Sequence, residues 1–92
     1  MRIIGYLPHE HYKLTVFKDN NRLSIKVESG LYEQTYKFRD RPELQTLDHA
    51  QSLVDDQWLS TVGAVFQTMH RAKNAALGRY LPPTDEYLDT II

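Results

Sequence analysis

Two histidines at positions 9 and 11 are the first side chains in this sequence whose type and spacing fit chemistry. Residues two apart on extended backbone point the same way, so His9 and His11 could offer two imidazole nitrogens to one metal ion. A metal site also needs a third and a fourth ligand. These would have to come from His49, His70 or an aspartate, and no spacing such as H-E-x-x-H links them to the pair. We favour the alternative, a solvated loop before a strand.

The second candidate site is the amide of Gln34, which the strand pattern places on an apolar sheet face between Tyr32 and Tyr36. A buried amide needs hydrogen-bond partners. We favour a structural role, in which tyrosine hydroxyls, a helix residue or a strand edge supply those partners. The functional alternative makes Tyr32, Gln34 and Tyr36 the floor of a small ligand pocket.

Signatures of catalysis are absent from the sequence. The chain has no cysteine, which excludes disulfides, cysteine-ligated zinc and a thiol nucleophile. G-x-S-x-G, the phosphate loop and G-x-G-x-x-G are also missing. Asp55 and Asp56 are adjacent, but consecutive helix residues diverge by about 100°, so they fit helix capping better than a catalytic pair. We expect no enzyme activity and no cofactor.

The residues around these candidates alternate between apolar and polar, which predicts strands. Residues 23–28, Leu-Ser-Ile-Lys-Val-Glu, alternate without a fault. We expect a meander of strands at 12–18, 22–29 and 31–38. Asn20-Asn21 and Ser29-Gly30 should form its turns, because Asn and Gly tolerate positive φ. A first strand at 2–7 leaves residues 8–11, and with them both histidines, in a loop.

Pairing across these turns sets apolar against apolar and opposite charges together. The first turn predicts three pairs: Val16 with Ile25, Leu14 with Val27, and Lys13 with Glu28. The second turn predicts Val27 with Tyr32, Leu23 with Tyr36, and Lys26 with Glu33. The first strand should pair Leu7 with Tyr12, Gly5 with Leu14, and Ile3 with Val16.

The second half of the chain has a helical period. After a polar connector at 39–46, residues 47–54 predict a short helix, and a long helix should begin after Asp55 or Asp56 and end near Gly78. Its apolar stripe is expected to consist of Trp58, Val62, Val65, Met69, Ala72 and Ala76, widened by Leu59, Phe66 and Leu77. In the remaining tail, Thr84 fits the cap of a short docking helix that carries Leu88, Ile91 and Ile92.

A single helical layer leaves the other face of the sheet uncovered, and we expect a contact surface there. Its apolar members are Ile4, Tyr6 and Phe17, and the apolar end of the tail joins them as interface candidates. Aromatic and lysine side chains on an open sheet also suit stacking on RNA bases. However, an RNP-type aromatic motif is missing, and Lys13 and Lys26 are expected to be neutralised by Glu28 and Glu33.

The totals describe one small, ordinary folded domain of 92 residues, with 41% hydrophobic and 25% charged residues. The net charge of −1 is uneven: residues 1–41 carry +3 and residues 42–92 carry −4. This asymmetry fits attraction between halves of one molecule or between subunits. No stretch approaches the roughly 20 apolar residues that cross a bilayer, and no leader is visible, so we expect a cytoplasmic protein without a membrane partner.

Together these patterns predict an α+β fold: a four-stranded antiparallel meander with one long C-terminal helix on one face and short flanking helices. We expect one domain over residues 1–78 and a C-terminal tail over 79–92. The leading functional hypothesis is a non-enzymatic interaction module, self-associating or binding a protein partner. The alternatives are a small-ligand or metal-binding domain that uses the tyrosine and glutamine face or His9 and His11, and, least favoured, a weak RNA or DNA binder.

Overall fold

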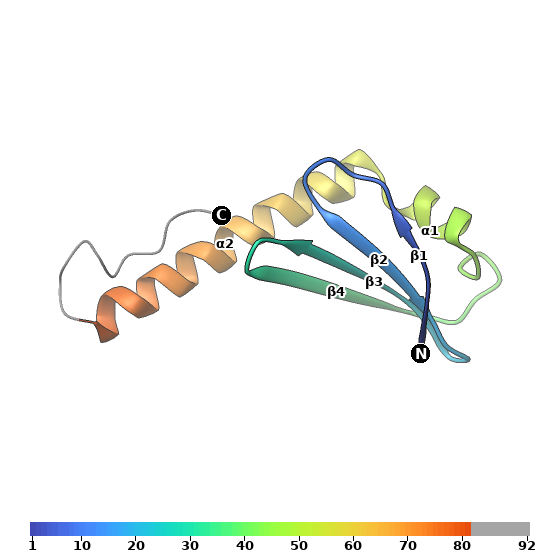
Figure 1. The fold of residues 1–92 in the computed structure, drawn as a ribbon, viewed down its shortest axis with the longest axis horizontal. Helices are drawn as coiled ribbons and strands as arrows, with labels where there is room; N and C mark the ends of the chain where they lie inside the picture. Colours follow the sequence, from blue (N-terminus) through green and yellow to red (C-terminus); the bar gives the residue numbers. More distant parts are fainter. Residues whose placement is uncertain (82–92) are drawn as a thin grey trace.

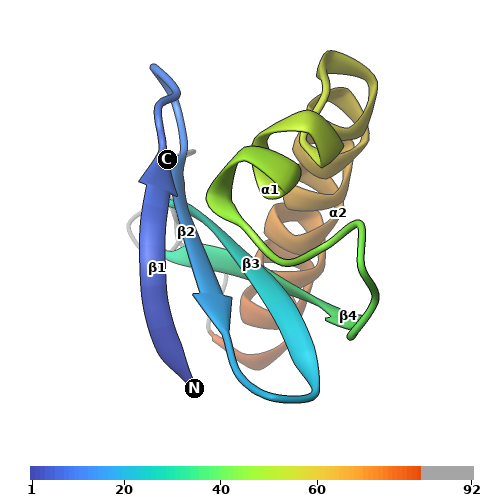
Figure 2. The ribbon, with the colours of Figure 1, turned by 90° about the vertical axis from the view of Figure 1, so that its right-hand side faces the viewer.

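The computed structural model describes residues 1–81 of the chain (Figure 1). Four antiparallel strands pair in sequential order: β1 (Arg2–Leu7), β2 (Lys13–Lys18), β3 (Arg22–Ser29) and β4 (Tyr32–Arg39). Two helices follow, α1 (Leu47–Leu53) and α2 (Asp56–Tyr80). Both lie on the same side of the sheet (Figure 2). The predicted α+β class, with a meander and one long helix on one face, is confirmed.

The core lies between the sheet and the helices, where the alternation in β3 placed it. Leu23, Ile25 and Val27 are all 0% exposed, and Val62 of α2 is also fully buried. Burying one such side chain is worth about 1.5–3 kcal/mol, so this row fixes which face of the sheet meets the helix. Other buried apolar side chains around it are Leu7, Leu14, Val16, Ala50 and Phe66.

The β2–β3 hairpin has the predicted register, with Val16 opposite Ile25, Leu14 opposite Val27 and Lys13 opposite Glu28. The predicted cause is wrong, because neither Asn20 nor Asn21 has a positive φ. A carboxylate oxygen of Asp19 holds the turn by accepting hydrogen bonds from the backbone N–H groups of Asn21 (2.8 Å) and Arg22 (2.9 Å). The Asn21 bond, followed by the Arg22 bond, lowers the pKa of the Asp19 carboxyl.

The β3–β4 register differs from the prediction by two residues. The turn consists of Gly30 and Leu31, so Ser29 pairs with Tyr32, and Gly30 has a φ of +58°. A two-residue hairpin loop with glycine in its first position is a favoured geometry. The outcome is Val27 opposite Gln34, Ile25 opposite Tyr36 and Leu23 opposite Phe38. The predicted pairing of Lys26 with Glu33 is therefore wrong: Lys26 lies opposite Thr35 and forms its ion pair with Glu28 at 3.4 Å.

The β1–β2 pairing also differs, because β1 contains a bulge between Ile3 and Gly5. Leu7 pairs with Leu14 and Gly5 with Val16, whereas Ile3 pairs with Phe17. A bulge sets two residues against one and so changes which side chains share a face. As a result, Ile4 packs against the core and Ile3 lies on the other face, which reverses the predicted placement of these two residues.

Both helices begin at capped N-termini. Thr46 accepts from the backbone N–H of His49 at 3.1 Å at the start of α1, and Asp55 accepts from that of Trp58 at 2.8 Å at the start of α2. Such caps contribute about 1 kcal/mol each. α2 continues two residues past Gly78, where its end was predicted. The predicted docking helix with Thr84, Leu88, Ile91 and Ile92 lies outside the described residues.

Only the first part of α2 packs on the sheet. Val62 and Phe66 are buried and Trp58, Leu59 and Met69 pack against the core, whereas the last turns project past the end of the sheet (Figure 1). The predicted stripe is wrong for Val65, Ala72 and Ala76, which are exposed. The contact face follows i, i+4 spacing through Trp58, Val62, Phe66 and His70, and a short sheet cannot cover a helix of 25 residues.

Two glycines allow close packing of elements on the core side. A Cβ at Gly5 would lie 2.6 Å from the Leu47 side chain of α1, and one at Gly63 would lie 3.1 Å from the Tyr12 hydroxyl. Both distances are shorter than ordinary van der Waals contact. The Gly63 contact agrees with the expectation that a glycine inside a helix marks a close approach.

We expect Ile25→Ala to destabilise the fold by about 2–5 kcal/mol, because it opens a cavity beneath α2. Chemical denaturation followed by circular dichroism measures this change. Glu33→Gln is the control: Glu33 is exposed and lies opposite Glu28, so its substitution should change stability by less than about 0.5 kcal/mol. Similar losses for both variants would contradict the assignment of the buried face.

Candidate interaction surface

The uncovered face of the sheet carries a small apolar and aromatic patch. Ile3 is 50% exposed and Tyr6 is 55% exposed, and both lie on β1. Phe17 of β2 pairs directly with Ile3 and is half-buried. Of the three side chains expected here, Tyr6 and Phe17 are present, and Ile3 takes the place of Ile4 because of the bulge. We call Ile3, Tyr6 and Phe17 the open-face patch.

Lysine side chains border the open-face patch. Lys13 Nζ lies 5.8 Å from the centre of the Tyr6 ring, and Lys26 Nζ lies 5.7 Å from the centre of the Phe17 ring. Each such contact is worth about 0.5–1 kcal/mol at an exposed site. Lys26 also pairs with Glu28. Neighbouring cations thus help to hold both aromatic rings in place.

Small polar side chains under this layer are buried although they point away from the core. Thr15 lies between Tyr6 and Lys26 across the strands and is only 3% exposed, and Ser24 lies between Phe17 and Lys37 and is 1% exposed. The large side chains beside them exclude water from the middle of this face. The middle of the open face is therefore shielded from water, although the side chains there are polar.

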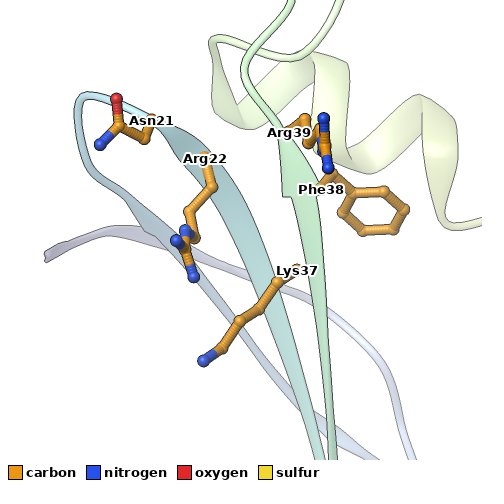
Figure 3. Close-up of a pocket in the computed structure, with 5 residues that line it drawn as sticks. All are labelled: Asn21, Arg22, Lys37, Phe38 and Arg39. Carbon is orange, nitrogen blue, oxygen red and sulfur yellow. The ribbon is translucent and has the colours of Figure 1, made fainter.

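A cationic hollow lies at the end of β3 and β4, on the part of the sheet that holds Phe17 and Ile3. Asn21, Arg22, Lys37, Phe38 and Arg39 line it, and its volume is about 450 Å³, part of it open to solvent. Arg22 and Arg39 are backbone partners across the two strands. Figure 3 shows Arg22 and Lys37 extending in the same direction from neighbouring strands, with the Arg39 side chain apart from them. Like charges on neighbouring strands repel, so this end of the sheet is strongly basic.

The cations of this hollow lie outside the salt bridges of residues 1–81, although the Asp19 carboxylate attracts Arg22 electrostatically. The salt bridges there join His11 to Glu10, Lys18 to Asp40, Lys26 to Glu28 and Arg41 to Glu43. None of them includes Arg22, Lys37 or Arg39. This hollow was not predicted from the sequence, although a signal was present: in the predicted register Arg22 faces Lys37, and in the observed register it faces Arg39.

A second hollow beside the first has balanced charge. Its lining includes Lys18, Asp19, Asp40 and Gln45. Asp40 accepts from Gln45 at 2.7 Å and pairs with Lys18 at 3.3 Å. The Gln45 hydrogen bond, and then the Lys18 hydrogen bond, lower the pKa of the Asp40 carboxyl. These contacts tie the connector after β4 to the end of β2, which gives this hollow a structural role.

The two histidines of the N-terminal loop are close together, with their rings edge to face and 5.9 Å between the ring centroids. The Nδ1 atom of His9 accepts hydrogen bonds from the backbone N–H groups of His11 and Tyr12, both at 3.1 Å, and its ring stacks on Tyr12. That nitrogen is used to close the loop, as the structural interpretation requires. Within residues 1–81, no three His, Cys, Asp or Glu side chains are grouped to hold a metal ion. A metal site at His9 and His11 stays a prediction.

Both polar atoms of the Gln34 amide are hydrogen bonded on the core side. Its Nε2 donates to the backbone carbonyl of Val62 in α2 at 3.0 Å, and its Oε1 accepts from the Tyr36 hydroxyl. A tyrosine and a helix residue therefore supply the partners that a buried amide needs. Tyr32 lies beside it in a separate contact, with its hydroxyl 2.9 Å from His70 Nδ1. A ligand pocket at Tyr32, Gln34 and Tyr36 stays a prediction.

The chain is not significantly similar to any protein family, curated protein or solved structure in our comparisons. Among residues 1–81, neither helix is long and apolar enough to span a membrane. Function must therefore be inferred from the surfaces described above.

We expect Tyr36→Phe to destabilise the fold by about 1–3 kcal/mol, because the Oε1 atom of Gln34 would remain buried without a donor. The double variant Gln34→Leu/Tyr36→Phe should lose less stability than Tyr36→Phe alone, since it also removes the buried amide that would be left without a donor. A double-mutant cycle by urea denaturation measures this coupling. Additive losses would contradict a hydrogen-bonded pair.

The Asp40 contacts predict a pH effect. Because the pKa of this carboxyl is lower in the folded protein, its contribution to stability is complete above the unfolded value and is lost as pH falls through the folded value. Asp40→Asn should therefore reduce the loss of melting temperature between about pH 6 and pH 3. Glu33→Gln is the matched control, and an equal reduction in that variant would contradict a specific role for Asp40.

Proposed function

We propose that this protein is a small non-enzymatic interaction module that associates with a second copy of itself through the open face of its sheet. The observation that supports this most directly is the placement of both helices on one side, which leaves Ile3, Tyr6 and Phe17 together on the other. Single apolar residues on a surface are ordinary. A contiguous group on an uncovered sheet is typical of a contact site.

The internal polar groups support the same proposal. Gln34, Tyr36 and Tyr32 use their polar atoms in hydrogen bonds within the chain, and His9 uses its Nδ1 atom to close a loop. Groups that are already partnered are poor candidates for binding a substrate. We further propose a cytoplasmic location, because the absence of cysteine fits a reducing compartment.

The experiment is sedimentation velocity of the full chain from about 1 to 200 μM. We expect a concentration-dependent monomer–dimer equilibrium. The double variant Ile3→Lys/Tyr6→Lys should weaken the dimer by about tenfold or more, because each substitution removes apolar contact and adds charge to an already basic face.

A matched control separates contact from general hydrophobicity. Leu31 is 78% exposed but lies in the β3–β4 turn, outside the open-face patch. Leu31→Lys should leave the dimer unchanged, and circular dichroism checks that all variants fold. A monomeric native protein over the whole concentration range would end the proposal.

A further inference from the structure

We infer that the cationic hollow of Arg22, Lys37 and Arg39 binds the acidic C-terminal segment, residues 84–92, of a second copy of this chain. The inference rests on the proposed self-association and names the contact that would make it specific. It combines the charge of the hollow, the composition of the segment and the reach of the chain.

The first step is the charge of the open face. Its side chains include five cations, Lys13, Arg22, Lys26, Lys37 and Arg39, and two carboxylates, Glu28 and Glu33, which gives a net charge of +3. Lys26 already has a carboxylate partner, whereas no salt bridge within residues 1–81 includes a cation of the hollow; Arg22 is attracted by the Asp19 carboxylate, and Lys37 and Arg39 have no carboxylate partner there. The unbalanced charge is therefore concentrated at one end of the sheet.

The second step is the composition of the segment. Residues 84–92 read Thr-Asp-Glu-Tyr-Leu-Asp-Thr-Ile-Ile, with three carboxylates at Asp85, Glu86 and Asp89 and no Lys or Arg. The segment charge of −3 equals the excess on the open face. Carboxylates suit guanidinium groups, which bind them with two parallel hydrogen bonds.

The third step is the position of an apolar surface beside the hollow. One cross-strand row on the open face runs Ile3, Phe17, Ser24, Lys37, so the apolar residues of β1 and β2 continue directly into the cationic residues of β3 and β4. A peptide whose carboxylates lie on Arg22, Lys37 and Arg39 would bring its apolar residues to this row. The segment has a similar order: its carboxylates begin first, and its apolar residues lie between or after them, at Leu88, Ile91 and Ile92.

The fourth step is the reach of the chain, which selects a second copy over the same chain. α2 runs antiparallel to β4, because Trp58 contacts Tyr36 and His70 contacts Tyr32. Tyr80 lies about 15 Å beyond His70 along the helix, and Arg39 lies about 23 Å from Tyr32 in the other direction. The two are thus about 38 Å apart.

The connecting chain is too short to bring Asp85 and Glu86 to the hollow of their own molecule. They follow Tyr80 by five and six residues and reach at most about 18 and 22 Å along the backbone, which falls short of about 38 Å even when the side chains are added. Only Asp89, at about 32 Å, comes within side-chain reach. Asp85 and Glu86 would arrive at their own hollow only if the last turns of α2 unwound, and the backbone N–H of Leu81 still donates to the Leu77 carbonyl. Docking on a second copy needs no unwinding.

A charge-swap experiment on the full chain tests this inference. One variant carries Arg22→Glu, Lys37→Glu and Arg39→Glu, and the other carries Asp85→Lys, Glu86→Lys and Asp89→Lys. Each variant alone should have a dimerisation affinity about tenfold or more below that of the native chain. An equimolar mixture should regain dimerisation, because every segment then meets a hollow of opposite charge. Raising NaCl from about 50 to 500 mM should weaken the native dimer.

Controls make each outcome decisive. Arg71→Glu/Arg79→Glu changes the charge on the exposed side of α2 and should leave the dimer intact. If circular dichroism shows that the triple glutamate variant does not fold, a neutral variant with Arg22→Gln, Lys37→Gln and Arg39→Gln replaces it. This neutral variant should dimerise about threefold or more weakly than the native chain.

Native dimerisation that neither variant weakens would overturn this inference but leave the proposed function standing. A third variant combines the substitutions of the hollow and of the segment in one chain. If this variant dimerises but the mixture of the two single-set variants does not, the segment docks within its own molecule, and the inference is overturned. A native chain that never dimerises would overturn the proposed function itself.

Discussion

The structure depends on one layer of apolar contact between the middle strands and α2. Side chains of a strand alternate between two faces, so once Leu23, Ile25 and Val27 are buried against the helix, their neighbours must face the other way. A chain of 92 residues has only two helices within its described part, and both are used to cover that one side. The open face, with its aromatic and basic side chains, follows directly from burying the other.

The polar contacts within the core determine how α2 lies on the sheet. Apolar packing alone would tolerate a helix shifted along its axis by one turn, because the shift would bring another apolar residue of the helix to each contact with the sheet. The hydrogen bond from Gln34 to the Val62 carbonyl and the contact of Tyr32 with His70 fix the helix along β4 at two points. This register carries the last turns of α2 past the sheet (Figure 1) and so sets where the rest of the chain begins.

Much of the fold could be predicted from the sequence, because its strongest pattern lies in its most buried part. Residues 23–28 alternate without a fault, and the hairpin that contains them has the predicted register. The β3–β4 pairing was wrong by two residues, and so was the β1–β2 pairing after the bulge, since a shift of two keeps every side chain on the same face and alternation cannot detect it. The bulge at Ile4 has one mark in the sequence, since a glycine inside a strand, here Gly5, is typical of a bulge, but that mark does not give the register on either side of it.

The candidate surfaces were predicted less well, because they depend on those outer pairings. Tyr6 and Phe17 were expected on the open face, but Ile3 could be placed there only after the bulge was known. The cationic hollow needs residues 17 positions apart, Arg22 and Arg39, to become direct neighbours. On α2, periodicity identified an apolar side but could not show how much of it the sheet covers, and Val65, Ala72 and Ala76 were therefore assigned to the core wrongly.

The edges of the sheet explain why a face is the better place for association. Unpaired edge strands invite pairing with other chains, and proteins block this with bulges and charged side chains. β1 carries a bulge, and exposed charged side chains recur along β4 at Glu33, Lys37 and Arg39. Both edges are thus poorly suited to forming a continuous sheet with another copy. The face between them combines apolar surface with an excess of positive charge, and the proposed partner would draw binding energy from the first and a fixed orientation from the second.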